Sequence, residues 1–304
     1  MSQYPIFPEF KSIEIEDRDV MQKVFWKYQP VTSEFTFTNL FMWRSYYQYQ
    51  WSVYKDWLLI LCNPMSWGYY FLQPVGPSPR LSVTWMILEW LRSEKQQPEP
   101  CIEKADERFV KEIGDQEGFL IEPLRDHFDY LYFTRNLINL IGRKYHSQKN
   151  RINKFMRQYE FQYEPMKSGH VDMCIRVLKE WCNWRECQKR TILRAEFFAV
   201  NEALLNFEKL HIQGGVVFVN DRIEGFALGE MLNEQTAVIH VEKVDPRIPE
   251  MFAVINQQFA EKEWHQVHFI DREQDLGEPG LRRAKESYHP VQLVKKYRIQ
   301  LLTR

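Results

Sequence analysis

Apolar side chains in the N-terminal part of the chain follow two spacings, one typical of helices and one typical of strands. Residues 31–44 and 81–93 place apolar side chains at the spacing of a helix with one buried face. Between them, residues 47–53, 57–61 and 68–75 are rich in aromatic and β-branched side chains. The pattern therefore predicts a helix, then hairpins or a meander, and then a second helix.

The C-terminal part predicts a longer and more mixed series of elements. Its strongest signal is a hairpin over residues 214–228, in which Asn220 and Asp221 form the turn between two apolar runs. A third strand is expected at residues 236–244. The other elements expected from the spacing are strands at residues 130–133, 161–166, 267–270 and 291–299, and helices at residues 137–159, 171–185, 193–210, 249–264 and from about Glu278.

The order of these elements determines the expected fold class. It is neither a regular βαβ repeat nor a sandwich, so a mixed α+β fold with a central, largely antiparallel sheet suits it. The 304 residues exceed the usual size of a single hydrophobic core. We therefore expect two domains, residues 1–130 and residues 131–304, with the boundary within residues 120–145.

Composition and charge argue against several kinds of site and partner. The formal net charge is -1, so a nucleic acid or an anionic membrane would have to bind a local basic patch. The five cysteines include no C-x-x-C pair, which argues against a disulfide framework and a zinc site and favours the reducing cytoplasm. The longest clearly apolar run, residues 57–62, is far shorter than the roughly 20 residues of a membrane-spanning helix. The first residues also lack the pattern of a signal peptide.

Four blocks of sequence carry a resemblance to a known family. They are residues 33–44 (SEFTFTNLFMWR), 142–154 (GRKYHSQKNRINK), 256–260 (NQQFA) and 271–290 (DREQDLGEPGLRRAKESYHP). Together they resemble an uncharacterised bacterial family related to the C-terminal domain of phosphatidylglycerol lysyltransferases. The resemblance spans nearly the whole chain.

This resemblance implies a fold and an activity. The fold is two tandem copies of the acyl-CoA N-acyltransferase (GNAT-like) domain, as in the Fem-type transferases that move amino acids from aminoacyl-tRNA to cell-wall precursors. The lysyltransferases likewise take an amino acid from aminoacyl-tRNA and attach it to a lipid. The implied donor is therefore aminoacyl-tRNA, and the implied partners are tRNA and an anionic lipid at a membrane surface.

One segment departs from the pattern of acetyl-CoA-using members of this fold. Those members place a Gln/Arg-x-x-Gly-x-Gly/Ala loop after the fourth strand, where backbone N–H groups hold the pyrophosphate of the cofactor. The matching segment here keeps Arg247 and Ala253, but Glu250 replaces the first glycine. Arg247 is thus the single candidate for cofactor binding, and Glu250 adds negative charge where a phosphate would lie.

A basic run precedes residue 160. Six basic residues and no acidic one fall within residues 142–159. Arginine forks and lysine ammonium groups bind phosphate, so this run is a candidate site for a tRNA backbone or a lipid headgroup. The alternative is a solvated helix face that pairs with nearby carboxylates. The candidate residues are Arg143, Lys144, Lys149, Asn150 and Arg151.

A second candidate cluster follows the strand predicted at residues 267–270. Gly277 and Gly280 permit a tight turn before a helix, on which Arg282, Lys285 and His289 would fall on one face. The cluster resembles the glycine, basic and aromatic run near the end of Fem-type transferases. We expect Arg282, Lys285, Tyr288 and His289 to bind phosphate or substrate.

Aminoacyl transfer needs a group that accepts a proton from the attacking nucleophile. Glu242 lies mid-strand, and strand alternation predicts that His240 and Glu242 share one side of the sheet. Asp271 and Glu273, at the end of the next strand, are the other candidate bases. The alternative for Glu242 is a carboxylate paired with Lys243 or with a neighbouring strand.

Three hypotheses about function follow. The first is aminoacyl transfer from aminoacyl-tRNA to a lipid or another amine or hydroxyl acceptor. The second is acyl-CoA-dependent N-acyl transfer, which the departure at Glu250 disfavours. The third is a non-catalytic binding protein that keeps the fold.

Overall fold

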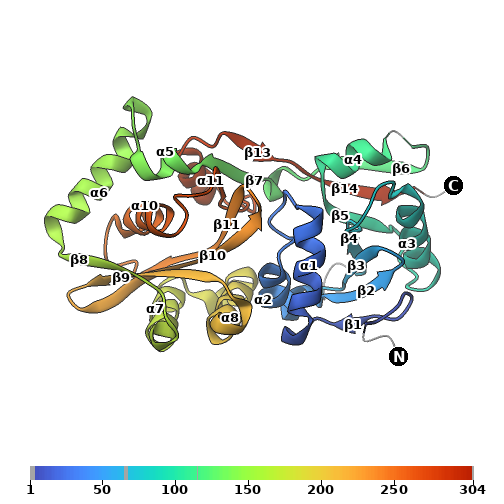
Figure 1. The fold of residues 1–304 in the computed structure, drawn as a ribbon, viewed down its shortest axis with the longest axis horizontal. Coiled ribbons are helices and arrows are strands. Elements are labelled where there is room, and N and C mark those ends of the chain that lie inside the picture. Colours follow the sequence, from blue (N-terminus) through green and yellow to red (C-terminus); the bar gives the residue numbers. More distant parts are fainter. Residues whose placement is uncertain (1–3, 65–67, 115, 303–304) are drawn as a thin grey trace. The chain divides into compact units, whose positions relative to one another are not determined.

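The chain forms two compact units, here called unit 1 and unit 2 (Figure 1). The computed structural model describes residues 4–64, 68–114 and 116–302. Unit 1 comprises Met1–Asp129 and Val294–Arg304, and unit 2 comprises Tyr130–Leu293. Each unit contains one mixed sheet flanked by helices, so the predicted α+β class is confirmed. No helix within the described ranges combines the length and the apolar character needed to cross a bilayer.

Unit 1 has the strand order β1-β2-β3-β4-β5-β14-β6. Its strands are β1 (Lys11–Ser12), β2 (Gln50–Tyr54), β3 (Trp57–Cys62), β4 (Tyr70–Leu72), β5 (Cys101–Asp106), β6 (Phe119–Pro123) and β14 (Lys296–Leu301), and its helices are α1 (Arg18–Tyr28), α2 (Phe37–Tyr47), α3 (Leu81–Ser93) and α4 (Glu107–Ile113). Strands β4 and β5 pair in parallel, and α3 connects them. Apolar residues of α3 and α4 pack against the sheet, among them Ile87, Leu88 and Phe109. Each such buried side chain contributes roughly 1.5–3 kcal/mol to stability.

Unit 2 has the strand order β13-β7-β12-β11-β10-β9-β8. Its strands are β7 (Asp129–Phe133), β8 (Phe161–Pro165), β9 (Gln213–Val219), β10 (Arg222–Asn233), β11 (Thr236–Val244), β12 (Phe269–Asp271) and β13 (Gln292–Val294), and its helices are α5 (Thr134–Asn139), α6 (His146–Gln158), α7 (Val171–Trp184), α8 (Thr191–Leu205), α9 (Phe207–Leu210), α10 (Met251–Glu263) and α11 (Pro279–Glu286). Helices α5, α6 and α10 lie on one side of the sheet and α7 and α8 on the other (Figure 1). Strands β11 and β12 pair in parallel with α10 between them in sequence, which repeats the β4-α3-β5 arrangement of unit 1.

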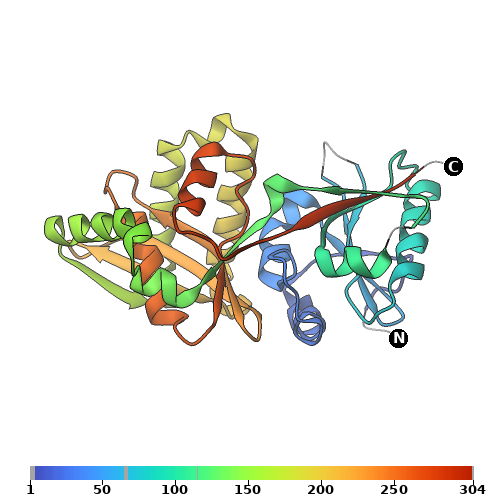
Figure 2. The ribbon, with the colours of Figure 1, turned by 90° about the horizontal axis from the view of Figure 1, so that it is seen from above.

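The C-terminal segment belongs to unit 1. Strand β14 inserts between β5 and β6 and pairs antiparallel with both. Figure 2 shows this red segment leaving unit 2 and joining the sheet of unit 1. The expected assignment of residues 131–304 to one domain is therefore wrong for the segment from Val294 onward, because its backbone hydrogen bonds complete the first sheet.

A buried group of charges surrounds Lys296, the first residue of β14, within unit 1. The ammonium group of Lys296 lies 2.7 Å from Asp129 Oδ1 and 2.7 Å from Glu34 Oε2, and all three side chains are at most 2% exposed. Ser33 donates to Asp129 through its backbone N–H at 2.9 Å. Lys104 lies 3.5 Å from Glu34. These polar contacts occupy the start of the predicted 31–44 helix, so α2 begins later, at Phe37.

The boundaries of the predicted elements differ from the structure in identifiable places. The predicted helix at residues 137–159 is split, since Leu140 and Gly142 adopt positive φ angles of 48° and 100° between α5 and α6. The last predicted strand, residues 291–299, divides into β13 and β14. Strands β5 and β6 and helices α1 and α4 were not predicted. β5 was not predicted because it carries the charged residues Glu103 and Lys104 where apolar residues are expected.

Candidate functional site

Strands β11 and β12 of unit 2 pair over a short length and then separate. Their register runs from Thr236 opposite Phe269 to Val238 opposite Asp271. β12 ends there, whereas β11 continues to Val244. We call the region beyond the last pair the β11–β12 fork. Ligands of sheets with parallel strands commonly bind outside the carboxyl ends of those strands, where neighbouring strands part.

The fork gathers charged side chains from four parts of unit 2. They come from β10, from β11, from the two residues after β12 and from α11. The members are Glu230, His240, Glu242, Arg272, Glu273 and Lys285. Opposite charges alternate among them, so the group is held together by its own ion pairs and hydrogen bonds.

Glu242 is fully engaged on the α10 side of the sheet. Arg272 Nη2 donates to its Oε2 at 2.5 Å, and Asn256 Nδ2 donates to its Oε1 at 2.9 Å. The Arg272 guanidinium lies 5.0 Å from the ring centre of Tyr288 and 5.9 Å from that of Tyr132. Both carboxylate oxygens of Glu242 therefore accept hydrogen bonds from side chains of unit 2.

A β-bulge re-aims His240 away from Glu242. Leu228 pairs with Val241 and Gly229 pairs with Ile239, so His240 is the additional residue on β11. Gly229 makes the close approach possible, since a Cβ there would lie 2.6 Å from the carbonyl oxygen of Val238. The expectation that His240 and Glu242 share one side is therefore wrong, because a bulge interrupts strict alternation.

His240 joins two carboxylates. Its Nδ1 lies 2.8 Å from Glu273 Oε1 and its Nε2 lies 2.9 Å from Glu230 Oε1, and the imidazole is only 1% exposed. Burial alone would lower the pKa of His240, but the hydrogen bonds to Glu230 and Glu273 outweigh it and raise the pKa to about 10. The ring is therefore a cation at neutral pH, with both nitrogens donating.

Lys285 of α11 anchors the segment that follows β12. Its ammonium group donates to the carbonyl oxygens of Arg272 and Glu273, the latter at 3.1 Å. Tyr132 in turn donates to the carbonyl oxygen of Lys285 at 2.7 Å. Burial, reinforced by the neighbouring Arg272 charge, lowers the pKa of Lys285 to about 8. This lysine is a buried structural donor that loses its proton far more easily than a surface lysine.

The predicted phosphate-binding stripe on α11 is divided in the structure. Arg282 pairs with Asp275 at 2.8 Å, and Lys285 points into the fork. His289 lies beyond the end of α11, and its Nε2 donates to the carbonyl oxygen of Lys144 at 2.9 Å. Burial favours protonation of Asp275, but hydrogen bonds led by Arg282 hold its pKa below the ordinary value. Gly277 adopts a φ of 73°, which fits the expected tight turn.

The basic run lies on the surface of α6 and of the turn before it. The five candidates Arg143, Lys144, Lys149, Asn150 and Arg151 are all exposed. Arg151 lies 3.6 Å and Lys154 3.4 Å from the carboxylate of Glu250. Part of the run thus pairs with a carboxylate, as the alternative interpretation expects, while the segment keeps an excess of positive charge.

Glu250 occupies the position before the first residue of α10. Its φ is 68°, in the left-handed region that favours glycine. Arg247, the candidate cofactor ligand, donates instead to Asp245 at 2.5 Å and to Glu180 at 2.6 Å. The helix end that would hold a pyrophosphate therefore presents a carboxylate and has its nearby arginine engaged elsewhere.

One group of carboxylates within the described ranges comes close enough together to hold a metal ion, namely Glu180, Glu224 and Asp245. Each already faces a guanidinium. Arg176 lies 3.0 Å from Glu180 and 3.6 Å from Glu224, and Arg247 lies 2.5 Å from Asp245. Arginine neutralises the charge that would bind a cation, so these residues do not fit a metal site.

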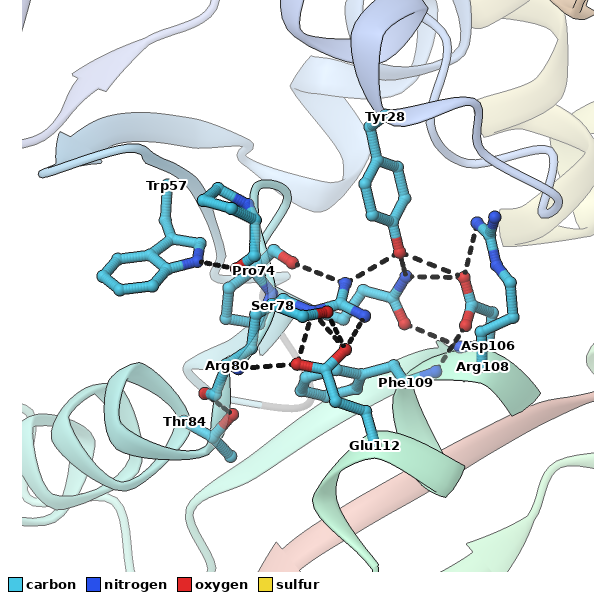
Figure 3. A network of polar contacts seen from close by, with 12 residues as sticks. Tyr28, Trp57, Pro74, Ser78, Arg80, Thr84, Asp106, Arg108, Phe109 and Glu112 are labelled. Atoms are coloured by element: carbon cyan, nitrogen blue, oxygen red, sulfur yellow. Dashed lines mark hydrogen bonds and ion pairs between the residues drawn. The ribbon is translucent and has the colours of Figure 1, made fainter.

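The corresponding β4–β5 fork of unit 1 is filled by its own side chains (Figure 3). Asp106, at the end of β5, accepts hydrogen bonds from Gln73 at 2.9 Å and from the Phe109 N–H at 2.7 Å. Arg80, directly before α3, donates to the Tyr28 hydroxyl at 2.7 Å and binds Glu112 at 2.5 Å. The carboxylate of Glu112 thus lies at the start of α3, as Glu250 lies at the start of α10 in unit 2.

The structure brings together some of the predicted site residues and separates others. Glu242, Glu273, Lys285 and Tyr288 surround the fork, and Asp271 accepts the Glu273 N–H at 2.7 Å. The candidates of the basic run lie on α6 and the turn before it, namely Arg143, Lys144, Lys149, Asn150 and Arg151. The other three candidates have the separate contacts described above, namely Arg282, His289 and Arg247. The sequence analysis did not name Glu230, His240 or Arg272 as site residues. Arg272 could have been found, because it and Glu273 are two charged residues directly after strand β12.

A comparison with family models identifies the family of the chain, and comparisons with solved structures show its fold. The family model described as phosphatidylglycerol lysyltransferase, C-terminal, matches residues 26–300. A conserved protein of unknown function from Bacteroides thetaiotaomicron VPI-5482 is 32% identical, with a TM-score of 0.89 over 96% of this chain and 99% of that one. The structure of L-PGS from Bacillus licheniformis gives 14% identity and a TM-score of 0.66 over 95% and 93%.

A tandem GNAT protein from the clavulanic acid biosynthesis pathway also matches in structure. Its identity is 8% and its TM-score 0.51, over 97% of this chain and 98% of that one. At such identities the likeness concerns the fold alone. It confirms the predicted tandem GNAT-like architecture.

Proposed function

The chain belongs to the family of the phosphatidylglycerol lysyltransferase C-terminal domain, within the aminoacyltransferase and acyltransferase superfamily, and we propose that it transfers an aminoacyl group. The proposed donor is aminoacyl-tRNA, and the proposed acceptor is a lipid or another molecule with an amine or hydroxyl group. The proposed location is the cytoplasm, with anionic lipid reached at a membrane surface.

The observation that carries the choice of donor is Glu250. Its carboxylate lies at the start of α10 and pairs with Arg151 and Lys154. A CoA pyrophosphate bound at this helix end would meet a like charge and would compete for the same two cations. The 3′ end of an aminoacyl-tRNA carries phosphodiesters and no pyrophosphate, so the proposed donor does not need a pyrophosphate site at this helix end.

The β11–β12 fork supplies groups suited to ester aminolysis or transesterification. Arg272 and Lys285 are cations next to partly exposed carboxylates, since Glu242 is 12% and Glu273 17% exposed. Acyl transfer needs a base for the attacking nucleophile and positive charge near the developing oxyanion. Both kinds of group are present within one set of connected side chains.

The exposed cations of α6 and the preceding turn are the proposed contact for the phosphates of the donor. Arginine and lysine side chains on one helix bind a phosphodiester backbone and release counterions from it. Lys149 and Arg157 are exposed members of this helix. Binding through such a surface weakens steeply as salt rises.

The experiment is a transfer assay with the purified chain. Bacterial tRNA charged with a mixture of radiolabelled amino acids is supplied with phosphatidylglycerol vesicles or with a mixture of soluble amines, and labelled acetyl-CoA is supplied in parallel. Label moving from tRNA into the lipid or amine fraction supports the proposal. Transfer from acetyl-CoA alone would establish the N-acyltransferase instead.

Binding measurements distinguish catalysis from binding. Charged tRNA is titrated at several salt concentrations with the wild type and with Lys149→Glu, and Lys209→Glu on the separate helix α9 serves as the control. Salt-dependent tRNA binding without any transfer would indicate a non-catalytic binding protein. Absence of both would refute the proposed donor.

A further inference from the structure

The backbone of Glu273 has a left-handed conformation and is fixed by three hydrogen bonds. Its φ of 55° lies in the left-handed region, which costs a residue other than glycine roughly 1–3 kcal/mol. Its N–H donates to Asp271 Oδ1 at 2.7 Å, and its carbonyl oxygen accepts from Lys285 at 3.1 Å and from the Tyr130 N–H at 3.2 Å. Such strain persists only where the surroundings fix it, and it concentrates at functional sites.

The carboxylate of Glu273 is also held by a hydrogen bond within unit 2. His240 binds Glu273 Oε1, and the position of the ring is fixed in turn by Glu230 on the neighbouring strand β10. The imidazole is 1% exposed and Glu230 10%, whereas Glu273 at 17% is the most exposed of the three. The hydrogen-bonded chain therefore leads from the interior of the sheet to the outer carboxylate.

Charge distinguishes this triad from the neighbouring ion pair. Glu230, protonated His240 and Glu273 together carry a net charge of about -1, whereas Glu242 and Arg272 cancel each other. Both oxygens of Glu242 accept from permanent donors. Glu273 is also the more exposed carboxylate, at 17% against 12% for Glu242, so it is the better placed of the two to meet a substrate.

We propose that Glu273 is the general base of the fork and that His240, held by Glu230, is the positioning residue that fixes its carboxylate. This inference rests on the proposed aminoacyl transfer. In the step it assigns, an acceptor hydroxyl or amine attacks the ester carbonyl carbon of the donor. A bond forms from the acceptor oxygen or nitrogen to that carbon, the proton of the acceptor moves to Glu273, and the ester C–O bond breaks. The same proton then passes to the departing ribose oxygen.

The first part of the test does not depend on turnover. In protein labelled with ¹⁵N-histidine and ¹³C-carboxyl glutamate, NMR titration of the wild type is compared with His240→Gln, Glu230→Gln and the exposed control His265→Gln. We expect the His240 ring to keep both protons above pH 8, and Glu230→Gln to make it titrate at lower pH. We also expect His240→Gln to change the chemical shift of the Glu273 carboxyl carbon at neutral pH, because the imidazolium that contacts this carboxylate is lost.

The second part uses the transfer assay, with folding checked by circular dichroism. Glu273→Gln should lower kcat by about 10²–10⁴-fold, the usual contribution of a general base. His240→Gln and Glu230→Gln should lower kcat on the order of 10²-fold through misplacement of the carboxylate, with KM nearly unchanged, and should shift the acidic limb of the pH profile. His265→Gln and the surface variant Glu208→Gln should match the wild type.

The two parts separate the possible failures. If no transfer occurs from aminoacyl-tRNA, the proposed function fails and the base assignment fails with it, whatever the NMR shows. If transfer occurs but Glu273→Gln retains kcat, or His240→Gln retains both kcat and the wild-type pH profile, the assignment alone is overturned. A His240 ring that titrates near its ordinary value would likewise overturn the positioning role.

Discussion

The two buried titratable groups of the fork, His240 and Lys285, predict an uncommon dependence of the stability of unit 2 on pH. The pKa of His240 is raised from its ordinary 6.5 to about 10, and that of Lys285 is lowered from 10.5 to about 8. The variants His240→Gln and Lys285→Met separate the contributions of these two groups to the pH dependence. Each removes one titration and leaves the other.

His240 and Lys285 change the stability of unit 2 in opposite directions as pH rises. Folded His240 keeps a proton that the unfolded chain loses above pH 6.5, so its stabilising contribution is complete below pH 6.5 and is lost as pH rises toward 10. Folded Lys285 loses a proton near pH 8 that the unfolded chain keeps until about 10.5, so stability rises across that interval. Between pH 8 and 10 the two effects oppose each other.

The free energy of unfolding changes by about 1.4 kcal/mol per pH unit for each proton that the folded and unfolded states bind differently. The free energy of unfolding of the wild type should fall by about 2 kcal/mol from pH 6.5 to 8, and then stay level to pH 9. His240→Gln should be level to pH 8 and then gain about 1 kcal/mol by pH 9. Lys285→Met should lose about 3 kcal/mol across the whole range.

The assay is urea denaturation at several pH values. Samples receive a short deuterium pulse at one common pH, and mass spectrometry of peptides from β10 and β11 reports the unfolding of unit 2. The exposed variant His265→Gln should reproduce the wild-type profile. A level wild-type profile from pH 6.5 to 8, or a His240→Gln profile with the wild-type slope, would refute the assignment of these two titrations.

Three further predictions concern other parts of the chain. Lys296→Met leaves two buried carboxylates without their main partner and should lower the free energy of unfolding of unit 1 by about 3–5 kcal/mol, whereas the half-exposed Lys295→Met should change it by under about 0.5 kcal/mol in the same denaturant titration. Glu250→Gly relieves a left-handed backbone conformation that costs about 1–2 kcal/mol and removes two weak surface ion pairs. Thermal melts should therefore show unchanged or higher stability. Calorimetry should show tighter CoA binding than in the wild type. Unchanged CoA affinity would contradict the role given to that carboxylate. Lys149→Glu should weaken tRNA binding and reduce the slope of log affinity against log salt by about one or more, and Lys209→Glu should leave that slope unchanged.

The sequence contained much of the fold because periodicity is strongest where a sheet or helix has one buried face. The hairpin at residues 214–228 and the strand at residues 236–244 correspond to β9, β10 and β11. Helix α3 coincides with the predicted 81–93 segment. Where charged residues enter a strand, as Glu103 and Lys104 do in β5, the pattern fails, because long-range ion pairs replace apolar contacts.

Some of the candidate residues lie together at the β11–β12 fork, but the contacts between them were not predicted. Glu242, Glu273 and Lys285 stand near one another because β11, β12 and α11 converge, which a strand-by-strand interpretation anticipates. The triad centred on His240 depends on one additional residue in β11 and on Glu230 of a different strand. A bulge has no reliable local signature, so alternation assigned the histidine to the wrong face.

The return of β14 to unit 1 has a consequence for biosynthesis. Unit 2 is an insertion within unit 1, since its chain begins after Asp129 and ends before Val294. A ribosome therefore delivers all of unit 2 before it delivers the strand that lies between β5 and β6 and the lysine that neutralises Asp129 and Glu34. Domains ordinarily mature in the order in which they emerge. Here the first unit to emerge is the last to be completed, because its sheet lacks the strand between β5 and β6, and Asp129 lacks its lysine partner, until the C-terminal segment has been synthesised.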